Sequence, residues 1–297
     1  TIFIILTALF TLSGVRRGVE KSSKVFMPIL FLLLIILGIR AVTLPGSSEG
    51  LAFLFKPEIK NVKSTVFLDA MGQAFFSLSI GMGCMTTYAS YFRNDVNLTK
   101  TAVQVSVLDT LVAILAGVVI FPSAFALTTN SDTIISDLVA GGPGLLFITI
   151  PRLFDQMSLS VLWSTFFFVL LALAAITSTI SLMEVTTIYI QEEYRISRKK
   201  ATFFVCIGVF ITGTISSFSP EFFNLLDYAS AKLMLPIGGF FISLFVGWYL
   251  DQRLIMAQIA NKGAIKYGIG FLKGYIFILR YVAPTAILAI FLYGLLS

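Results

Sequence analysis

The stretch Gln73–Ala74–Phe75–Phe76–Ser77–Leu78–Ser79–Ile80–Gly81–Met82–Gly83 lies within an uncharged run, residues 70–92, that is long enough to cross a bilayer. Two serines and two glycines alternate near the centre of this run. Serine side chains bond to nearby backbone, and each glycine weakens a helix by about 1 kcal/mol relative to alanine. In hydrocarbon, unwound backbone persists only where protein, water or a ligand satisfies its polar groups. The stretch therefore predicts a helix break near the bilayer midplane, with a binding site around the break.

The composition indicates an integral membrane protein. Only 12% of the 297 residues are charged, against about 25% in soluble domains, and 57% are apolar. The formal charge of +6 is concentrated in short loops between apolar runs, which argues against nucleic acid as a partner. The chain has no histidine, and its two cysteines, Cys84 and Cys206, both lie inside apolar runs. Histidine-based catalysis and His/Cys metal sites are therefore excluded.

Apolar runs near the length of about 20 residues that a membrane helix needs divide the chain into candidate spans. They are residues 1–14 (truncated), 24–44, 68–92 (broken near 77–83), 100–126, 158–190, 200–217, 221–250 and 271–296. All should be helices of a single transmembrane domain, because an open sheet cannot satisfy its edges in lipid. Residues 131–156 include Gly141–Gly142–Pro143–Gly144 and an apolar stretch too short to span. We expect this segment to form an extracellular helical hairpin.

Lysine and arginine are concentrated in alternate loops. The first, third, fifth and seventh loops hold most of them, with Arg16, Arg93, Arg195 and Arg253 as examples. Positively charged loops favour the cytoplasmic side of a membrane. These four loops are therefore predicted to be cytoplasmic, and the C-terminus is predicted to be extracellular. The expected location is the plasma (inner) membrane, crossed several times.

Ionisable side chains within the predicted spans are costly, so each marks a candidate functional position. Asp109 lies well inside its span, where a carboxylate needs a cation, a set of donors or a proton. Asp227 and Lys232 share one span, but a separation of five residues does not stack two side chains on a helix. The sequence assigns no specific role to Glu184 or Arg280.

A second polar cluster at midplane depth is Ala174–Ala175–Ile176–Thr177–Ser178–Thr179. Hydroxyl oxygens, and carbonyl oxygens left accessible by small neighbours, suit a hard monovalent cation such as Na⁺. Small and hydroxyl residues also mediate ordinary helix packing in membranes. The cluster alone leaves both interpretations open.

Taken together, these stretches resemble the neurotransmitter:sodium symporter family, in its bacterial amino-acid transporter branch. The matching segments run in order along the whole chain: Gly18–Lys21, Met27–Pro28, Gly72–Gly83, Thr87–Tyr91, Phe121–Pro122, Thr149–Pro151, Ile176–Ser178, Ser197–Lys199 and Leu226–Tyr228. The resemblance implies an all-α polytopic membrane protein with the inverted-repeat, leucine-transporter-like fold and discontinuous helices, of which this family is itself the known example. The spans would correspond to helices four to eleven. We therefore expect a fragment that lacks the first three helices, has a partial fold and does not transport by itself.

The resemblance also implies the site residues. The substrate-binding residues would be Phe76, Ser77, Ser79, Met82, Ser178 and Leu182. The first sodium site would take Ser77 and Asp109, and the second would take Ala174 through its carbonyl, Thr177 and Ser178. The outer gate would comprise Gln73, Phe76 as an aromatic lid, and Asp227, whose arginine partner would lie on the missing first helix.

Two positions depart from the usual family pattern. Asp109 stands where the family usually has asparagine, and Ala113 stands where chloride-dependent relatives have serine. Asp109 can supply the negative charge that bound chloride otherwise supplies, which predicts chloride-independent, sodium-coupled symport by alternating access. Met82 stands where some relatives have phenylalanine. Methionine is flexible, and with Phe76 and Leu182 it suits an apolar or aromatic amino acid as substrate.

The realistic alternative is a proton-coupled or uncoupled amino-acid transporter of the same fold. A membrane-embedded enzyme is less favoured, because Asp109 and Asp227 form the sole candidate pair of carboxylates and neither lies in a catalytic motif. We expect a transporter rather than an enzyme, with Na⁺ as the co-transported ion and no organic cofactor. Its partners would be a small-molecule amino acid and the lipid bilayer, and a homodimer is left open.

Overall fold

The computed structural model describes residues 2–14, 20–56, 64–92, 96–127, 147, 150–155, 157–260 and 269–296. Within these ranges the backbone is almost entirely helical and contains no β-strand. Six helices in the same ranges are long and apolar enough to cross a membrane: Ser23–Val42, Leu98–Ala126, Ser160–Glu193, Arg198–Phe218, Pro220–Tyr249 and Gly270–Leu295. The predicted class, an all-α multi-pass membrane protein, is confirmed.

Some sequence predictions fall outside the described residues. Most of the predicted hairpin 131–156 does so, and its described helix is α9 (Ile150–Asp155). Several loop cations used for the orientation, among them Arg16 and Arg93, also lie outside. The orientation of the chain in the membrane therefore stays a prediction.

The chain divides into two compact units, which are described separately. The second unit comprises Leu6–Asn61 and Thr110–Ile180. It contains α2 (Glu20–Val42), α3 (Ser47–Phe55), α9, most of α1 (Ile2–Leu12), and parts of α6 (Leu98–Leu127) and α10 (Ser160–Glu193). Leucines recurring every three or four residues on α2 bury one face of that helix. The buried core comprises Leu30, Leu33, Leu34, Leu37, Leu44, Val119, Phe154, Met157, Phe167 and Leu170.

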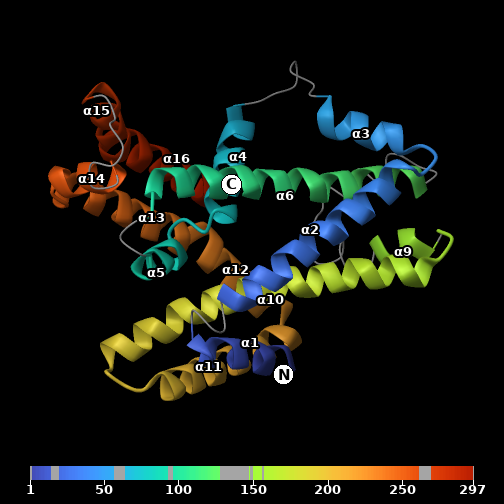
Figure 1. Ribbon diagram of the computed structural model, residues 1–297, viewed down its shortest axis with the longest axis horizontal. Helices are drawn as coiled ribbons and strands as arrows, with labels where there is room; N and C mark the ends of the chain where they lie inside the picture. Colours follow the sequence, from blue (N-terminus) through green and yellow to red (C-terminus); the bar gives the residue numbers. More distant parts are fainter. Residues whose placement is uncertain are drawn as a thin grey trace. The chain divides into compact units, whose positions relative to one another are not determined.

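The first unit comprises Thr1–Ile5, Val62–Asp109 and Ser181–Ser297. Here α4 (Ser64–Ser77) and α5 (Cys84–Ser90) are separate helices joined by the short non-helical link 78–83 (Figure 1). After α11 (Arg198–Phe218), residues 220–249 run as α12 (Pro220–Asp227), η4 (Tyr228–Met234), α13 (Leu235–Leu244) and η5 (Phe245–Tyr249). The short helix α14 (Gln252–Ile259) follows, and then α15 (Ile269–Phe277), η7 (Ile278–Val282) and α16 (Ala283–Leu296).

Two of the π-helical segments, η4 and η7, end two residues before a proline, Pro236 or Pro284. A proline cannot donate a backbone hydrogen bond, and its ring crowds the carbonyl one turn earlier. Widening the preceding turn to a π-turn is one of the recognised ways in which a helix accommodates such a disruption. The sequence thus explains why these two spans change their helical geometry.

The first unit has a small buried core where three helices meet. Phe75 of α4, Leu235 of α13 and Ile287 of α16 are buried together, and Met82 and Phe240 pack against them. Both α4 and α13 pack against α16. The broken helix is therefore packed against α13 and α16 at Phe75, in the last turn of α4.

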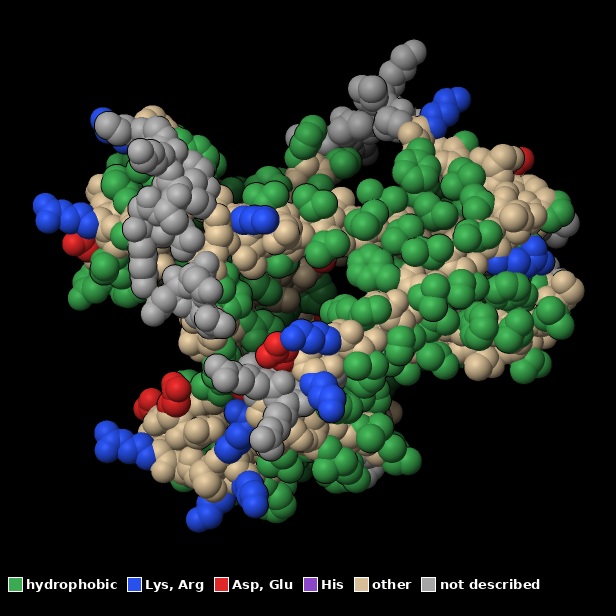
Figure 2. Space-filling view, in the orientation of Figure 1, with side chains coloured by type: hydrophobic (Ala, Val, Ile, Leu, Met, Phe, Trp, Pro, Cys, Tyr) green, Lys and Arg blue, Asp and Glu red, His purple; other side chains and the backbone are tan. Residues whose placement is uncertain are grey.

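Large apolar side chains remain on the surface of the described residues. Val161 is 78% exposed and Phe204 is 58% exposed, and hydrophobic side chains form much of the face seen in Figure 2. Soluble proteins rarely expose large continuous apolar patches. This surface suits contact with lipid.

Candidate functional site

The break between α4 and α5 is built from backbone conformations that the sequence favours. Ser79, Gly81 and Gly83 have φ values of 54°, 90° and 79°, in the left-handed region. Glycine adopts this region without a steric penalty, whereas a residue with a Cβ, such as Ser79, does so at a cost. The glycines that marked the break in the sequence are the residues at which the chain turns.

The end of α4 is closed by hydrogen bonds that return to its last turn. The amides of Leu78, Ser79 and Ile80 donate to the carbonyls of Ala74, Phe76 and Phe75, at 3.1, 3.0 and 3.1 Å. Helix α5 then starts with the amide of Thr87 donating to Gly83 at 2.8 Å. Much of the freed backbone is thus satisfied within the break itself.

Ser77 and Asp109 are brought together beside the break. The Ser77 hydroxyl Oγ lies 2.8 Å from Oδ1 and 2.7 Å from Oδ2 of Asp109, which is half-buried on α6. A hydroxyl has one hydrogen, so it donates to one carboxylate oxygen at a time and keeps its lone pairs as acceptors. The pair offers a negative charge and several oxygens at one point, which is a suitable arrangement for a monovalent cation.

The other residues predicted to surround the substrate on this side are arranged along the break. Phe76 at the end of α4 is half-exposed, and Ser79 is partly buried in the link. Met82 packs against the small core of Phe75, Leu235 and Ile287. An aromatic ring and a thioether thus lie on either side of the Ser77 hydroxyl along the chain.

The second predicted oxygen cluster lies on α10. The hydroxyls of Thr177 and Ser178 both donate to the carbonyl oxygen of Ala174, at 2.8 and 3.1 Å. Three oxygens therefore converge within one helical turn, and each hydroxyl oxygen keeps its acceptor lone pairs. Ser178 and Leu182 are one turn apart on the same helix and both are exposed.

The predicted gate residues Gln73 and Asp227 are both exposed, near the end of α4 and at the end of α12. Neither side chain makes a hydrogen bond or an ion pair with any other residue in the described part of the chain. The structure thus leaves both side chains accessible and does not pair them.

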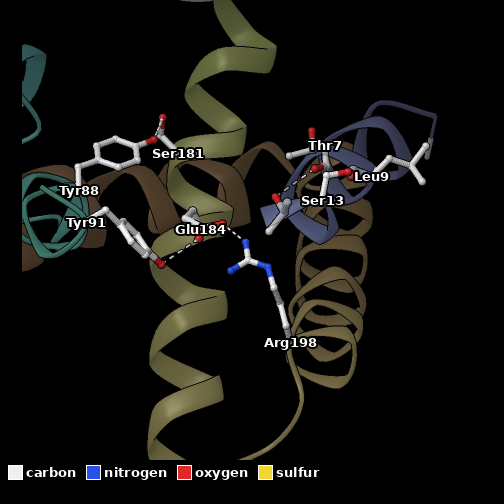
Figure 3. A network of polar contacts seen from close by, with 9 residues as sticks. Thr7, Leu9, Ser13, Tyr88, Tyr91, Ser181, Glu184 and Arg198 are labelled. Atoms are coloured by element: carbon white, nitrogen blue, oxygen red, sulfur yellow. Dashed lines mark hydrogen bonds and ion pairs between the residues drawn. The ribbon is translucent and has the colours of Figure 1, made fainter. Parts of the chain in front are cut away.

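A polar network that the sequence did not predict joins α5, α10 and the start of α11 (Figure 3). Glu184 is completely buried, and its Oε2 accepts a hydrogen bond from the Arg198 guanidinium in an ion pair. The Tyr91 hydroxyl approaches Glu184 Oε1 at 3.4 Å, and the Tyr88 hydroxyl donates to Ser181 Oγ at 2.6 Å. The sequence did contain a signal for this network. Tyr88 and Tyr91 are three residues apart, as are Ser181 and Glu184, and residues at this spacing lie on the same face of a helix.

The two intramembrane cations without a predicted role also have partners. Lys232 Nζ lies 5.5 Å from the ring centre of Tyr228, one turn earlier in η4. Arg280 of η7 donates through Nε to the Gly247 carbonyl of η5, and its guanidinium lies over the Trp248 ring at 5.5 Å. With its amide oxygen turned toward Arg280, Gln252 accepts from the guanidinium at 3.1 and 2.7 Å. Arg280 thus joins the last two spans.

A membrane-spanning, all-helical chain whose helix breaks at a polar site has the architecture of a secondary transporter. A profile of the "Sodium:neurotransmitter symporter family" matches residues 1–297. The chain belongs to this family, whose members are transporters rather than enzymes, as the motifs predicted.

Individual relatives agree with this assignment. An uncharacterized sodium-dependent transporter, YhdH of Bacillus subtilis, is 32% identical over 100% of this chain and 66% of its own length. A second, from Haemophilus influenzae, is 33% identical over 99% of this chain and 64% of its own length. The crystal structure of MhsT in complex with L-phenylalanine matches with a TM-score of 0.84 and 38% identity, over 99% of this chain and 66% of MhsT. The chain thus spans about two thirds of these relatives' length.

Proposed function

We propose that the protein containing this chain is a sodium-coupled amino-acid symporter that works by alternating access and does not require chloride. The contact between Ser77 and Asp109 carries this proposal. It supports a first sodium site that combines a fixed carboxylate, a hydroxyl and the substrate carboxylate. Family membership supports Na⁺ as the co-transported ion.

Electrostatics explains why chloride would be dispensable. At an effective dielectric constant near 20, one unit charge about 4 Å from a cation contributes on the order of 4 kcal/mol. Asp109 carries such a charge on the protein, next to Ser77. A mobile anion would then add a second negative charge where one suffices.

The remaining site residues take the roles that the resemblance suggested. A second sodium ion would bind to the Ala174 carbonyl and the hydroxyls of Thr177 and Ser178, whose oxygens converge on one helical turn. Gln73 and Asp227 would form the outer gate with Phe76 as a lid. The exposed side chains of Gln73 and Asp227 are compatible with a gate that closes on a partner residue.

The proposed substrate is an apolar or aromatic amino acid. Phe76, Met82 and Leu182 are the side chains proposed to face it, and none of them carries a charge. MhsT, which shares the fold, was crystallised with L-phenylalanine. L-Phenylalanine is therefore the first substrate to test.

Uptake of L-phenylalanine into proteoliposomes tests the proposal. We expect uptake to follow an imposed Na⁺ gradient and to be the same in chloride and in gluconate. Uptake driven by a proton gradient without Na⁺ would instead support the proton-coupled alternative.

The variant Asp109→Asn separates the charge of this residue from its shape. We expect its uptake to become dependent on chloride, since the mobile anion then replaces the lost charge. The matched control is Asp251→Asn, because Asp251 caps α14 and asparagine caps a helix as well as aspartate does. Uptake by Asp109→Asn that is unchanged and still independent of chloride would contradict the proposed role of Asp109.

A further inference from the structure

Helix α13 has a recess at Gly239 that is filled by the ring of Phe75, the residue just before Phe76, which is proposed to bind substrate. A Cβ atom placed on Gly239 would lie 3.0 Å from Cε2 and 3.2 Å from Cε1 of Phe75, and closer still to Cζ. Real Cβ atoms do not approach other atoms as closely as Cζ would require. The ring therefore occupies its position because residue 239 has no side chain.

A second close approach lies on the other side of the break. A Cβ on Gly238 would be 2.8 Å from the carbonyl oxygen of Gly81, and a Cβ on Gly81 would be 3.0 Å from the amide nitrogen of Gly239. The φ of Gly81 is +90°. These neighbours are backbone atoms, which cannot rotate away as the end of a side chain can. The link and α13 thus meet backbone to backbone.

The two contacts flank three of the residues proposed to bind substrate or sodium, namely Phe76, Ser77 and Ser79. Phe75 precedes Phe76 and Ser77, and Gly81 follows Ser79. The Phe75 carbonyl also accepts the amide hydrogen of Ile80 at 3.1 Å, which closes the segment into a loop. Both ends of this loop are therefore held against one helix, while the Ser77 hydroxyl between them reaches Asp109.

We infer that Phe75, Gly238 and Gly239 are positioning residues that seat the broken helix on α13 and so set the geometry of the substrate and first sodium sites; this inference rests on the proposed function. Binding groups work only when held within about 0.5 Å of their productive position. A methyl group at residue 239 displaces the Phe75 ring, and with it the adjoining Phe76 and Ser77.

Glycine in a span does not by itself indicate such a seat. Gly208 and Gly213 of α11 have no atom within 4 Å of a Cβ placed on them, and the same holds for Gly274 of α15. These glycines are therefore matched controls, since a methyl group there meets open space. Gly238 and Gly239 differ from these glycines in their close contacts with Gly81 and Phe75.

The test is a size exchange between the two partners, in the protein reconstituted with Na⁺ and probed with L-phenylalanine. We expect Gly239→Ala to weaken both L-phenylalanine and Na⁺ binding by about tenfold or more per folded molecule, the usual loss when a residue that supports ion ligands is changed. Phe75→Leu removes the ring atoms that clash, so Gly239→Ala with Phe75→Leu should regain much of the affinity. Gly213→Ala should bind both ligands as the unmodified protein does.

Two measurements keep a positioning role apart from simple stability. A merely structural role would lower the melting temperature of Gly239→Ala and leave the affinity of its folded fraction unchanged, which would overturn the inference. Failure of Phe75→Leu to rescue Gly239→Ala would overturn it as well. If Gly239→Ala does not fold, Phe75→Leu alone is decisive: it should bind several-fold more weakly, and unchanged binding would refute the inference.

A different result would contradict the proposed function: the unmodified protein would bind no amino acid in the presence of Na⁺. The melting temperatures of the same variants would then still test the seat: recovery of stability in the double variant supports it, and no recovery rejects it.

Discussion

Replacing Arg198 by alanine should be among the most destabilising changes in the described part of the chain. The substitution leaves the Glu184 carboxylate, which is completely buried, without its ion-pair partner. Removing one member of a buried pair typically costs about 3–5 kcal/mol, because the remaining charge is left uncompensated. The Tyr91 hydroxyl at 3.4 Å is too distant to replace a guanidinium. We therefore expect Arg198→Ala to lower the free energy of unfolding by about 3–5 kcal/mol.

A double-mutant cycle isolates the contribution of the pair. Glu184→Gln removes the charge and keeps the shape, so Arg198→Ala should cost much less in that background. The expected coupling energy lies at the upper end of the usual range of about 0.5–3 kcal/mol. Unfolding would be followed by titration with denaturant in detergent micelles at fixed protein concentration.

The chain supplies its own control in the exposed pair Glu20–Lys24. Its atoms are 2.6 Å apart, but the side chains are 51% and 73% exposed. Such a pair on a helix surface contributes about 0.2–0.5 kcal/mol. If the Glu184–Arg198 cycle gave a coupling energy as small as the Glu20–Lys24 cycle, the argument from burial would be refuted.

Two further predictions concern contacts between helices. Tyr88→Phe removes the hydroxyl that donates to Ser181 at 2.6 Å. It should lower the free energy of unfolding by about 1 kcal/mol in the same denaturant titration. As a control, Tyr189→Phe changes an exposed side chain and should leave the free energy of unfolding unchanged. Arg280→Leu leaves the Gly247 carbonyl without its side-chain donor and should lower the free energy of unfolding by about 1–3 kcal/mol. An unchanged unfolding midpoint would show that this contact does not stabilise the packing of the last two spans.

Local patterns were sufficient for the fold class and for the break. Hydropathy over about 20 residues is sufficient to predict a membrane helix, because a single segment in lipid can satisfy its backbone hydrogen bonds only as a helix. The glycines at 81 and 83 marked the break because their preference for positive φ is a property of the residue itself. Both signals act within one or two helical turns and need no knowledge of neighbouring segments.

The sites show where local reasoning stops. The sequence, read through its family resemblance, named Ser77 and Asp109 as members of one site, but the separation of 2.7–2.8 Å between their oxygens depends on how α4 and α6 pack. Glu184 was recognised as a costly intramembrane charge, and its partner could not be assigned, since several cationic residues lie in the same stretch of sequence. The tertiary structure places Arg198 of α11 beside Glu184 of α10.

Hydropathy and backbone preference are encoded locally, so the amino-acid sequence predicts a helical membrane protein with a helix broken near residues 77–83, and its motifs indicate the family to which it belongs. Tertiary packing set the contact geometry between Ser77 and Asp109, which the family resemblance had placed in one site, and it paired Arg198 with Glu184 and Phe75 with Gly239, which no sequence pattern had predicted. Each of these contacts joins segments that are not neighbours along the helix, and each depends on atoms placed to within a few tenths of an ångström. That precision comes from close packing, which no stretch of sequence specifies without its neighbours.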